Sequence, residues 1–231
     1  MIETGYYIAK ERRLLKTFNN LLKRYSKVIS TRYGTEFSNK IQEDAPVFYK
    51  KLIPNIPFYD ARSYQKIIII NSQIIALIRA MEKHGKTVED AVTVQVELFK
   101  KDYGKIPSFA GRIFTSKIGG FFLNKLAKKV TDEGWYTDYI KGKAGDDFDV
   151  SIVTKNCGLV KYIESEGMMQ YSKYCNFSDF IMFREMGIGL TQPMEPKNGN
   201  CVFCMKNRSH TKIPSSLDVI YSKELKEYIS D

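Results

Sequence analysis

The sequence lacks any uncharged apolar stretch that is long enough to cross a membrane. Its densest apolar run, Ile67–Ile70, is far shorter than the ~18 residues that a membrane-spanning helix needs. The first residues include Glu3 and Tyr6, where a secretory signal would have a basic start and an apolar stretch. We therefore expect a cytoplasmic protein with reduced cysteines and no membrane partner.

The common catalytic signatures are also missing. The chain has only 2 histidines and contains no HExxH zinc helix, no glycine-rich phosphate loop and no GxSxG nucleophile elbow. These absences argue against zinc peptidases, P-loop nucleotidases and α/β-hydrolases, and we expect no cofactor and no resident metal. Hydrophobic residues make up 43% and charged residues 27% of the chain, which excludes wholesale disorder.

Acidic residues are outnumbered, with 26 Asp and Glu against 36 Lys and Arg, so the net charge is +10. Half of this excess lies in residues 1–30, and the rest is scattered among carboxylates. A basic protein tends to meet anions, and we expect a small anionic substrate. The chain shows no interleaving of aromatic and basic residues that would indicate a single-strand nucleic-acid groove, so nucleic acid is a weak candidate partner. A homo-oligomer stays open.

The first ~130 residues have the apolar spacing of amphipathic helices. Gly85 suits a helix C-terminus, and Thr87 with Asp90 resembles a capping box that starts the next helix. Pro54 and Pro57 predict an extended connection. The predicted helices cover residues 8–30, part of 35–52 with an interruption near Pro46, 63–83, 88–102 and 108–130.

The second half changes character. Residues 131–147 are rich in turn formers and charge, which predicts a connection. From Asp147 the apolar period becomes two, which is typical of a strand, and Asn198-Gly199 is a strong hairpin signal. The predicted elements are a strand from 147, helices over 158–167 and 178–186, strands over 187–195 and 201–207, and a tail helix over 222–229.

These patterns predict an α+β fold. A helical N-terminal half would pack on a small C-terminal mixed α/β unit with a β-α-α-β-β order. We expect a helical region over residues 1–134 and an α/β region over 146–213, which together form one compact domain over 1–231.

All four cysteines lie in the second region: Cys157, Cys175, Cys201 and Cys204. Three interpretations stay open. Free cysteines are often buried as small hydrophobes. Cys201 and Cys204 form a CxxC pair that suits zinc, although residues three apart on a strand point to opposite faces. A cysteine-rich pocket could also hold a reactive thiolate, and Cys157 lies where a strand feeds a helix, with the helix N-terminus and Lys155 available to lower its pKa.

A second group follows Cys175. Ser178 and Asp179 stand at the start of a predicted helix, where they either cap the helix or contribute a hydroxyl and a carboxylate that activates water. Arg184 is a candidate clamp for a substrate carboxylate, because a guanidinium binds carboxylates through two parallel hydrogen bonds. His210 is either a general base or an exposed tail residue, and His84 is most simply a partner of a helix C-terminus.

The segment from Phe148 to Asn207 resembles the C-terminal part of the L-2-amino-thiazoline-4-carboxylic acid hydrolase family. Members have an F-D-F-D strand that ends in a cysteine, a helix, a cysteine closely followed by an aspartate, a strand, and a G-x-x-C-x-F turn. The matching positions here are Phe148–Val150, Cys157, Cys175 with Asp179, Gly187–Met194, and Gly199 to Phe203 with a gap near Gly199. The helical half is also similar, at Asn55–Pro57 and Ala80–Ala91, so the resemblance spans about residues 45–208.

The resemblance implies a hydrolase that opens a C–N bond of a cyclic amidine such as a thiazoline, or that acts on a related small carboxylate. It implies that Cys157, Cys175 and Asp179 are catalytic, with Asp179 as base or orienter and one of the two cysteines as nucleophile. The substrate-binding candidates are Arg184, Ser178, Thr191 and Cys201.

Three positions depart from the family pattern. Leu190 stands where members often have arginine, Val202 where they have an acidic residue, and Cys204 where they have another arginine. These changes are compatible with a different C–N or C=N substrate, or with binding without turnover. The 4-vinyl-reductase-like domain also ends in a Gly-x-x-Cys-x-Phe pattern, so a non-enzymatic small-ligand or metal-binding sensor module is the alternative function.

Overall fold

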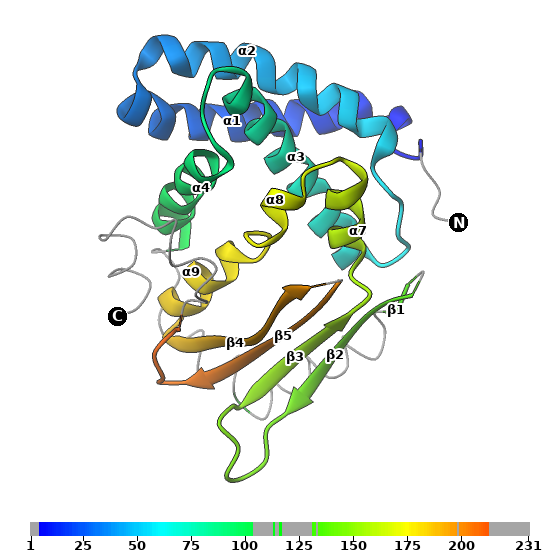
Figure 1. Ribbon diagram of the computed structural model, residues 1–231, viewed down its shortest axis with the longest axis vertical. Helices are drawn as coiled ribbons and strands as arrows, with labels where there is room; N and C mark the ends of the chain where they lie inside the picture. The colour runs from blue at the N-terminus through cyan, green and yellow to red at the C-terminus, as the bar shows by residue number, and fades with distance from the viewer. Residues whose placement is uncertain are drawn as a thin grey trace. The chain divides into compact units, whose positions relative to one another are not determined.

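The computed structural model describes residues 5–103, 113, 116, 131–132, 134–197 and 199–212 (Figure 1). The chain divides into two compact units, one of Met1–Leu98 with Ser165–Gln170 and one of Phe99–Glu164 with Tyr171–Asp231. This division falls well before the boundary that we expected at residue 134. The predicted helices over 108–130 and 222–229 lie outside the described residues, apart from Ile113 and Ser116.

The first unit is helical. Its elements are η1 (Ile8–Lys10), α1 (Glu11–Tyr33), α2 (Thr35–Leu52), η2 (Ile53–Asn55), α3 (Arg62–Lys83) and the start of α4 (Val88–Tyr103). Apolar faces of α1, α2 and α3 form its core, where Phe18 and Tyr49 pack with ring centroids 4.7 Å apart. Within the described part of the chain, no helix has the length and apolar character to cross a membrane.

The predicted interruption near Pro46 is wrong, because α2 runs unbroken from Thr35 to Leu52 through this proline. A proline inside a helix removes one backbone hydrogen bond and crowds the preceding turn. Tertiary packing offsets that cost here. Ile41, Ala45 and Tyr49 lie four residues apart on one face of α2 and are fully buried, so the helix continues in order to keep this face in the core.

The junction between α3 and α4 follows the sequence signals. Gly85 has φ +77°, and the N–H groups of Gly85 and Lys86 donate to the carbonyls of Glu82 and Met81 at 3.0 Å each. This is the Schellman arrangement that satisfies the last carbonyls of a helix. Next, the Asp90 N–H donates to the Thr87 hydroxyl at 3.1 Å and the Thr87 N–H donates to the Asp90 carboxylate at 3.0 Å. The predicted capping box is confirmed.

The second unit contains the sheet. Its elements are β1 (Thr131–Asp132), β2 (Trp135–Lys141), β3 (Val150–Lys155), α7 (Gly158–Ser165), α9 (Phe177–Glu185), β4 (Ile188–Lys197) and β5 (Asn200–Asn207). The short helix α8 (Met169–Ser172) begins in the first unit and ends in the second. The strands form one antiparallel sheet in the order β1-β2-β3-β5-β4. The chain is therefore an α+β protein with a helical N-terminal half, as the sequence predicts.

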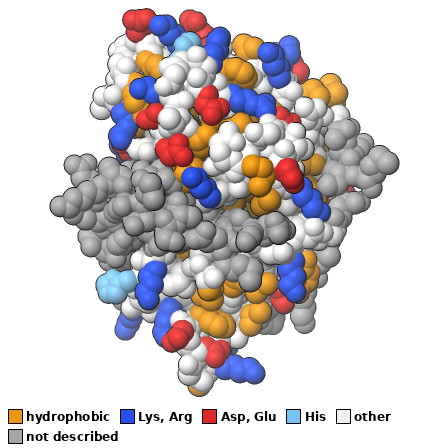
Figure 2. Space-filling model, in the orientation of Figure 1, with side chains coloured by type: hydrophobic (Ala, Val, Ile, Leu, Met, Phe, Trp, Pro, Cys, Tyr) orange, Lys and Arg blue, Asp and Glu red, His pale blue; other side chains and the backbone are white. Residues whose placement is uncertain are grey.

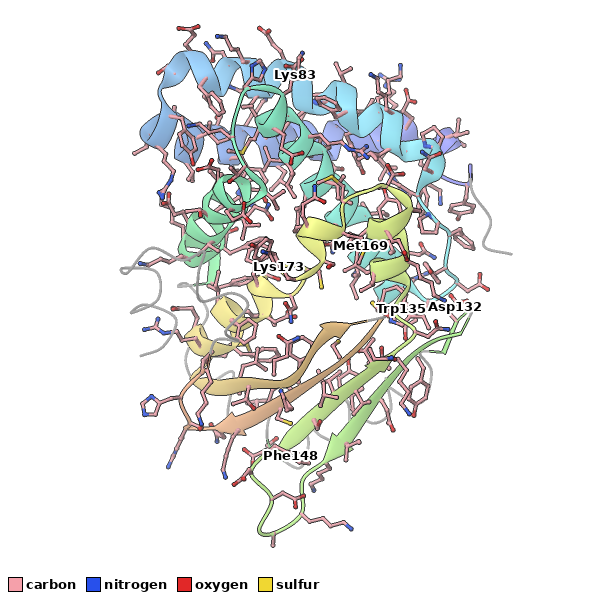
Figure 3. All side chains as sticks on the ribbon, viewed as in Figure 1. Lys83, Asp132, Trp135, Phe148, Met169 and Lys173 are labelled. Atoms are coloured by element: carbon pink, nitrogen blue, oxygen red, sulfur yellow. The ribbon has the colours of Figure 1, made fainter. Side chains whose placement is uncertain are left out.

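Two features add to the predicted elements, a hairpin of β1 and β2 before the α/β unit and a short helix within that unit. The segment expected to be a connection contains β1 and β2, joined at Gly134, where φ is +79°. Trp135 is buried while Tyr136 beside it is exposed, so the alternation of a strand is present between the glycines and charges that suggested a loop. Figure 3 shows Trp135 and Asp132 together at this turn, where they are paired across β1 and β2. The short helix α8 is the second addition.

The sheet has two distinct faces. Register places Val150 opposite Met205, Ile152 opposite Phe203 and Thr154 opposite Cys201, so these six residues share one face. We call it the helix face, because α7 and α9 lie on one side of the sheet (Figure 1) and α9 contacts β4. Val150 and Met205 are buried on this face, whereas Tyr136 and Ile140 on the other face are exposed.

The capping box provides a test of the helical unit. We expect Thr87→Ala to lower its free energy of unfolding by about 1 kcal/mol, because α4 loses a cap. Thr87→Ser keeps the hydroxyl and should retain most of that free energy. Urea unfolding followed by far-ultraviolet circular dichroism measures both variants, and equal losses for Ala and Ser would contradict the assignment.

Candidate site of three thiols and a carboxyl

Cys157 is held at one end of the sheet by three turns. It follows β3, and its N–H donates to the Gly199 carbonyl at 2.8 Å. The preceding residue, Asn156, donates through its backbone N–H to the Asn200 side chain at 3.2 Å and through its own side chain to the Gly134 carbonyl at 3.0 Å. The β1–β2 turn, the end of β3 and the β4–β5 turn are therefore tied together at Cys157.

Gly199 allows this close approach. Its φ is +75°, and a Cβ added there would lie 3.0 Å from the Cys157 nitrogen. A side chain at this position would combine a disfavoured backbone conformation with crowding against Cys157. Gly199 therefore also fixes the position of Cys157.

Cys175 and Asp179 come from the turn before α9 and from its first turn. The Cys175 N–H donates to the Ser172 carbonyl at 3.3 Å, and the Asp179 N–H donates to the Asn176 carbonyl at 2.9 Å. Asn176 occupies the N-cap position and makes no side-chain capping bond. The capping interpretation of Ser178 and Asp179 is therefore wrong, since both lie inside the helix.

Four groups from these segments are close enough to interact electrostatically. The pKa of the Cys175 thiol is well above its usual value, chiefly because of burial and further because of Cys157, Cys201 and Asp179. We call these four residues the thiol–carboxyl cluster. Cys201 lies on the helix face opposite Thr154, whose hydroxyl hydrogen-bonds the thiol. Cys157, Asp179 and Cys201 therefore lie within electrostatic range of the Cys175 thiol.

Asp179 is the most perturbed acid of the cluster. Burial in the protein raises the pKa of its carboxyl from 3.8 to about 7, because a charged carboxylate is poorly solvated there. The Asp179 charge also acts on two tyrosine hydroxyls. The pKa values of Tyr103 and Tyr139 are raised by burial first and by the Asp179 charge second. A carboxyl in this state can both accept and release a proton near pH 7.

The thiols are held in their neutral form. Burial raises the pKa of Cys157, and it outweighs the N–H groups of Val160 and Leu159 and the nearby Lys161 ammonium, which lower it. The helix N-terminus that the sequence predicted beside Cys157 is present, but it does not lower the pKa of the thiol below its usual value. The cation that acts on Cys157 is Lys161 and not the predicted Lys155. Burial also raises the pKa of Cys201 to about 12.

Cys204 stands apart from the cluster. It pairs with Ser151 on the other face of the sheet, where its thiol lies 3.7 Å from the Ser151 hydroxyl. The two cysteines of the CxxC pair therefore point to opposite faces. Within the described ranges, no group of three or more His, Cys, Asp or Glu side chains is arranged to hold a metal ion, and the zinc interpretation gains no support there.

The other predicted binding residues lie elsewhere. Arg184 is five residues beyond Asp179, so the two side chains leave α9 about 140° apart, and its guanidinium pairs with Glu185 at 3.2 Å. The Thr191 hydroxyl donates to the Cys204 carbonyl at 3.4 Å. His210 is exposed in the segment after β5, and His84 ends α3 with Nε2 2.7 Å from the Asp44 carboxylate.

Sequence reasoning missed Thr154, Lys161 and the two tyrosines that sense Asp179. Lys161 could have been predicted from the sequence, because it lies one helical turn after Cys157. Thr154 is found only through the register of β3 against β5, and Tyr139 lies in a strand that was not predicted.

No family model matches the chain, and no curated protein or solved structure matches it either.

The raised pKa of Asp179 predicts how stability depends on pH. In the unfolded chain the carboxyl loses its proton near 3.8, whereas in the folded chain it does so near 7. Between these values the folded state binds the extra proton, so stability falls as pH rises, and the loss is complete above about pH 7. Asp179→Asn removes this loss and should stabilise the second unit at pH 8 but not at pH 3.5.

The chain's single tryptophan, Trp135, is buried in β2, so its fluorescence reports unfolding of that unit. Each kcal/mol of unfolding free energy that Asp179→Asn regains should raise the thermal unfolding midpoint by roughly 2–4 °C. The exposed Asp60, changed to Asn, is the matched control. An equal shift at both pH values would show that Asp179 does not titrate with a raised pKa.

The thiols predict a second observable. At neutral pH Cys201, with a pKa of about 12 against an ordinary 9.0, contains about a thousandfold less thiolate than an unperturbed cysteine. Timed alkylation of native and urea-unfolded protein, read by peptide mass spectrometry, should show Cys157, Cys175 and Cys201 protected in the native state. Fast native alkylation of Cys157 or Cys175 at pH 7 would instead identify a reactive thiolate.

Proposed function

We propose that this chain is a hydrolase that opens the C–N bond of a small cyclic amidine carboxylate at the thiol–carboxyl cluster. The proposal rests on one observation, that Asp179, Cys157 and Cys201 all act electrostatically on the Cys175 thiol. It is also supported by the sequence resemblance to the 2-amino-thiazoline-4-carboxylate hydrolases, whose matching positions are these residues.

Asp179 would act as the general base and then as the general acid. The oxygen of a water molecule bonds to the amidine carbon while one of its protons passes to the Asp179 carboxylate and from there to the ring nitrogen. The ring C–N bond then breaks as the new hydroxyl becomes a carbonyl, and Asp179 passes the hydroxyl proton to the departing nitrogen. A carboxyl with a pKa near 7 suits both transfers, and the site needs no outside reactant besides water.

The thiols would have a different role from the nucleophile that the resemblance implies. Their raised pKa values leave very little thiolate at neutral pH, so attack by water is favoured over attack by sulfur. Neutral thiols are small, weak donors that can line a pocket for a sulfur-containing ring. Lys161 is then a better candidate than Arg184 for the substrate carboxylate, because its ammonium acts on Cys157.

A binding module without turnover is the second candidate function. Leu190 stands where family members often have arginine, and it is fully buried against Met205 across the strands. Leucine therefore puts hydrocarbon where family members have a cation. This difference favours a changed substrate, or a ligand that is bound and not hydrolysed. Binding of a cyclic amidine acid without any product would identify this candidate.

The activity test uses 2-amino-thiazoline-4-carboxylate and a panel of related cyclic amidine acids. Mass spectrometry should detect products that gain the mass of one water. Asp179→Asn should lower kcat by about 10²–10⁴-fold, because it removes the proton-transfer group. Asp60→Asn, the same chemical change at an exposed position, should leave kcat unchanged, and equal turnover by both variants would remove Asp179 from the mechanism.

A further inference from the structure

The segment after β5 folds back along the edge of the sheet. We call residues 208–212 the return segment. The Lys212 N–H donates to the Leu190 carbonyl at 2.9 Å, and the Leu190 N–H donates to the Thr211 hydroxyl at 3.3 Å. The Arg208 N–H donates to the Gly187 carbonyl at 3.3 Å. The return segment therefore lies along the first residues of β4, and hydrogen bonds to Gly187 and Leu190 hold it there at both ends.

Gly189 is the point of closest approach. A Cβ added there would lie 2.6 Å from the Ser209 carbonyl carbon, so only glycine fits beneath the return segment. Thr211 is buried on its inner side, whereas Arg208, His210 and Lys212 are exposed. The exposed side chains of Arg208, His210 and Lys212 thus occupy every second position of a backbone that hydrogen bonds hold in place.

Two recesses open beside the return segment and share Ser209 and His210. The larger has a volume of about 550 Å³ and the smaller about 240 Å³. Together they are of the size that small-molecule sites usually have. Figure 2 colours the side chains of the molecule by type, with basic side chains and histidine in separate colours. Neither recess is lined by a residue of the thiol–carboxyl cluster.

Positive charge dominates the lining. Lys206 and Lys212 line the larger recess and Arg184 and Arg208 the smaller. Asp147 also lines the larger recess, but its carboxylate is 4.0 Å from the Lys206 ammonium and both side chains are well exposed, so the pair neutralises little. Glu185 balances Arg184 in part at 3.2 Å. The recesses keep an excess of cations even when His210 is neutral.

A polar donor adds to this charge. Gln192 lines the larger recess, and its side-chain nitrogen is buried without a hydrogen-bond partner among the residues that the structure describes. An unpaired donor is costly, and an anionic oxygen in the recess would satisfy it after rotation of the amide. Ser209 and Thr191 supply hydroxyl groups to the same lining.

We propose that the paired recesses along the return segment bind a small organic anion that carries phosphate or carboxylate groups. This site uses other residues than the proposed catalytic cluster and stands whether or not the chain is a hydrolase. A small molecule is favoured over nucleic acid, because among the described lining residues there is no Phe, Tyr or Trp on which a base could stack.

The two histidines make the proposal directly testable. With ¹³C-labelled histidine, the ring signals of His210 report the recesses, and those of His84, paired with Asp44 in the helical unit, are the internal control. Titration with inorganic pyrophosphate and, separately, with citrate should shift His210 saturably and leave His84 in place. The two titrants distinguish a phosphate preference from a carboxylate preference. No shift of His210 with either would overturn the proposal.

Charge variants locate the binding. Changing Lys206 and Lys212 together to Gln should weaken binding of the better titrant by at least about tenfold. The matched control changes the exposed Lys23 and Lys27 of α1 to Gln, which removes the same charge, and it should leave the Kd unchanged. Equal weakening by both pairs, or tighter binding of a single-stranded RNA than of pyrophosphate, would overturn the small-anion site.

Discussion

The hydrogen bond from the Cys157 N–H to the Gly199 carbonyl, 2.8 Å long, is the constraint on which the candidate site depends. It joins the residue that leaves β3 to the turn that enters β5, and so it fixes Cys157 relative to Cys201. Because Gly199 has a positive φ and almost touches the Cys157 nitrogen, the two backbones have little room to move. The sheet register then places Thr154 opposite Cys201, and α9 supplies the carboxyl.

The same arrangement has an energetic cost. Placing three thiols there costs little, since Cys157 is buried, Cys175 and Cys201 are partly buried, and a neutral thiol behaves as a small hydrophobe. Burying a carboxyl is different, and the pKa of Asp179 near 7 means that its ionised form is destabilised in the folded chain, on the order of a few kcal/mol. A hydrocarbon side chain would suit the same position better for stability. The presence of Asp179 there is therefore more easily explained by chemistry than by packing.

Local signals were sufficient for the junction between α3 and α4. The Schellman glycine at Gly85 and the capping box at Thr87 depend only on neighbouring residues, and both were predictable. At Pro46 local signals gave the wrong prediction, because the helix continues there through the packing of buried residues against distant segments. The β1–β2 hairpin was missed for a similar reason. Its strand character is confined to seven residues between glycines, and it is stabilised by pairing with β3.

The candidate site shows what a sequence can and cannot supply. Residue types and spacing singled out Cys157, Cys175 and Asp179, and the fold brings them together with Cys201. The protonation states did not follow from the sequence. A helix N-terminus beside Cys157 suggested a lowered pKa, but burial has the larger effect and raises it. That sign reversal changes the chemistry. In the proposed mechanism it moves the reactive role from sulfur to the Asp179 carboxyl, because the group whose pKa lies nearest to neutrality is the one that can transfer a proton in both directions.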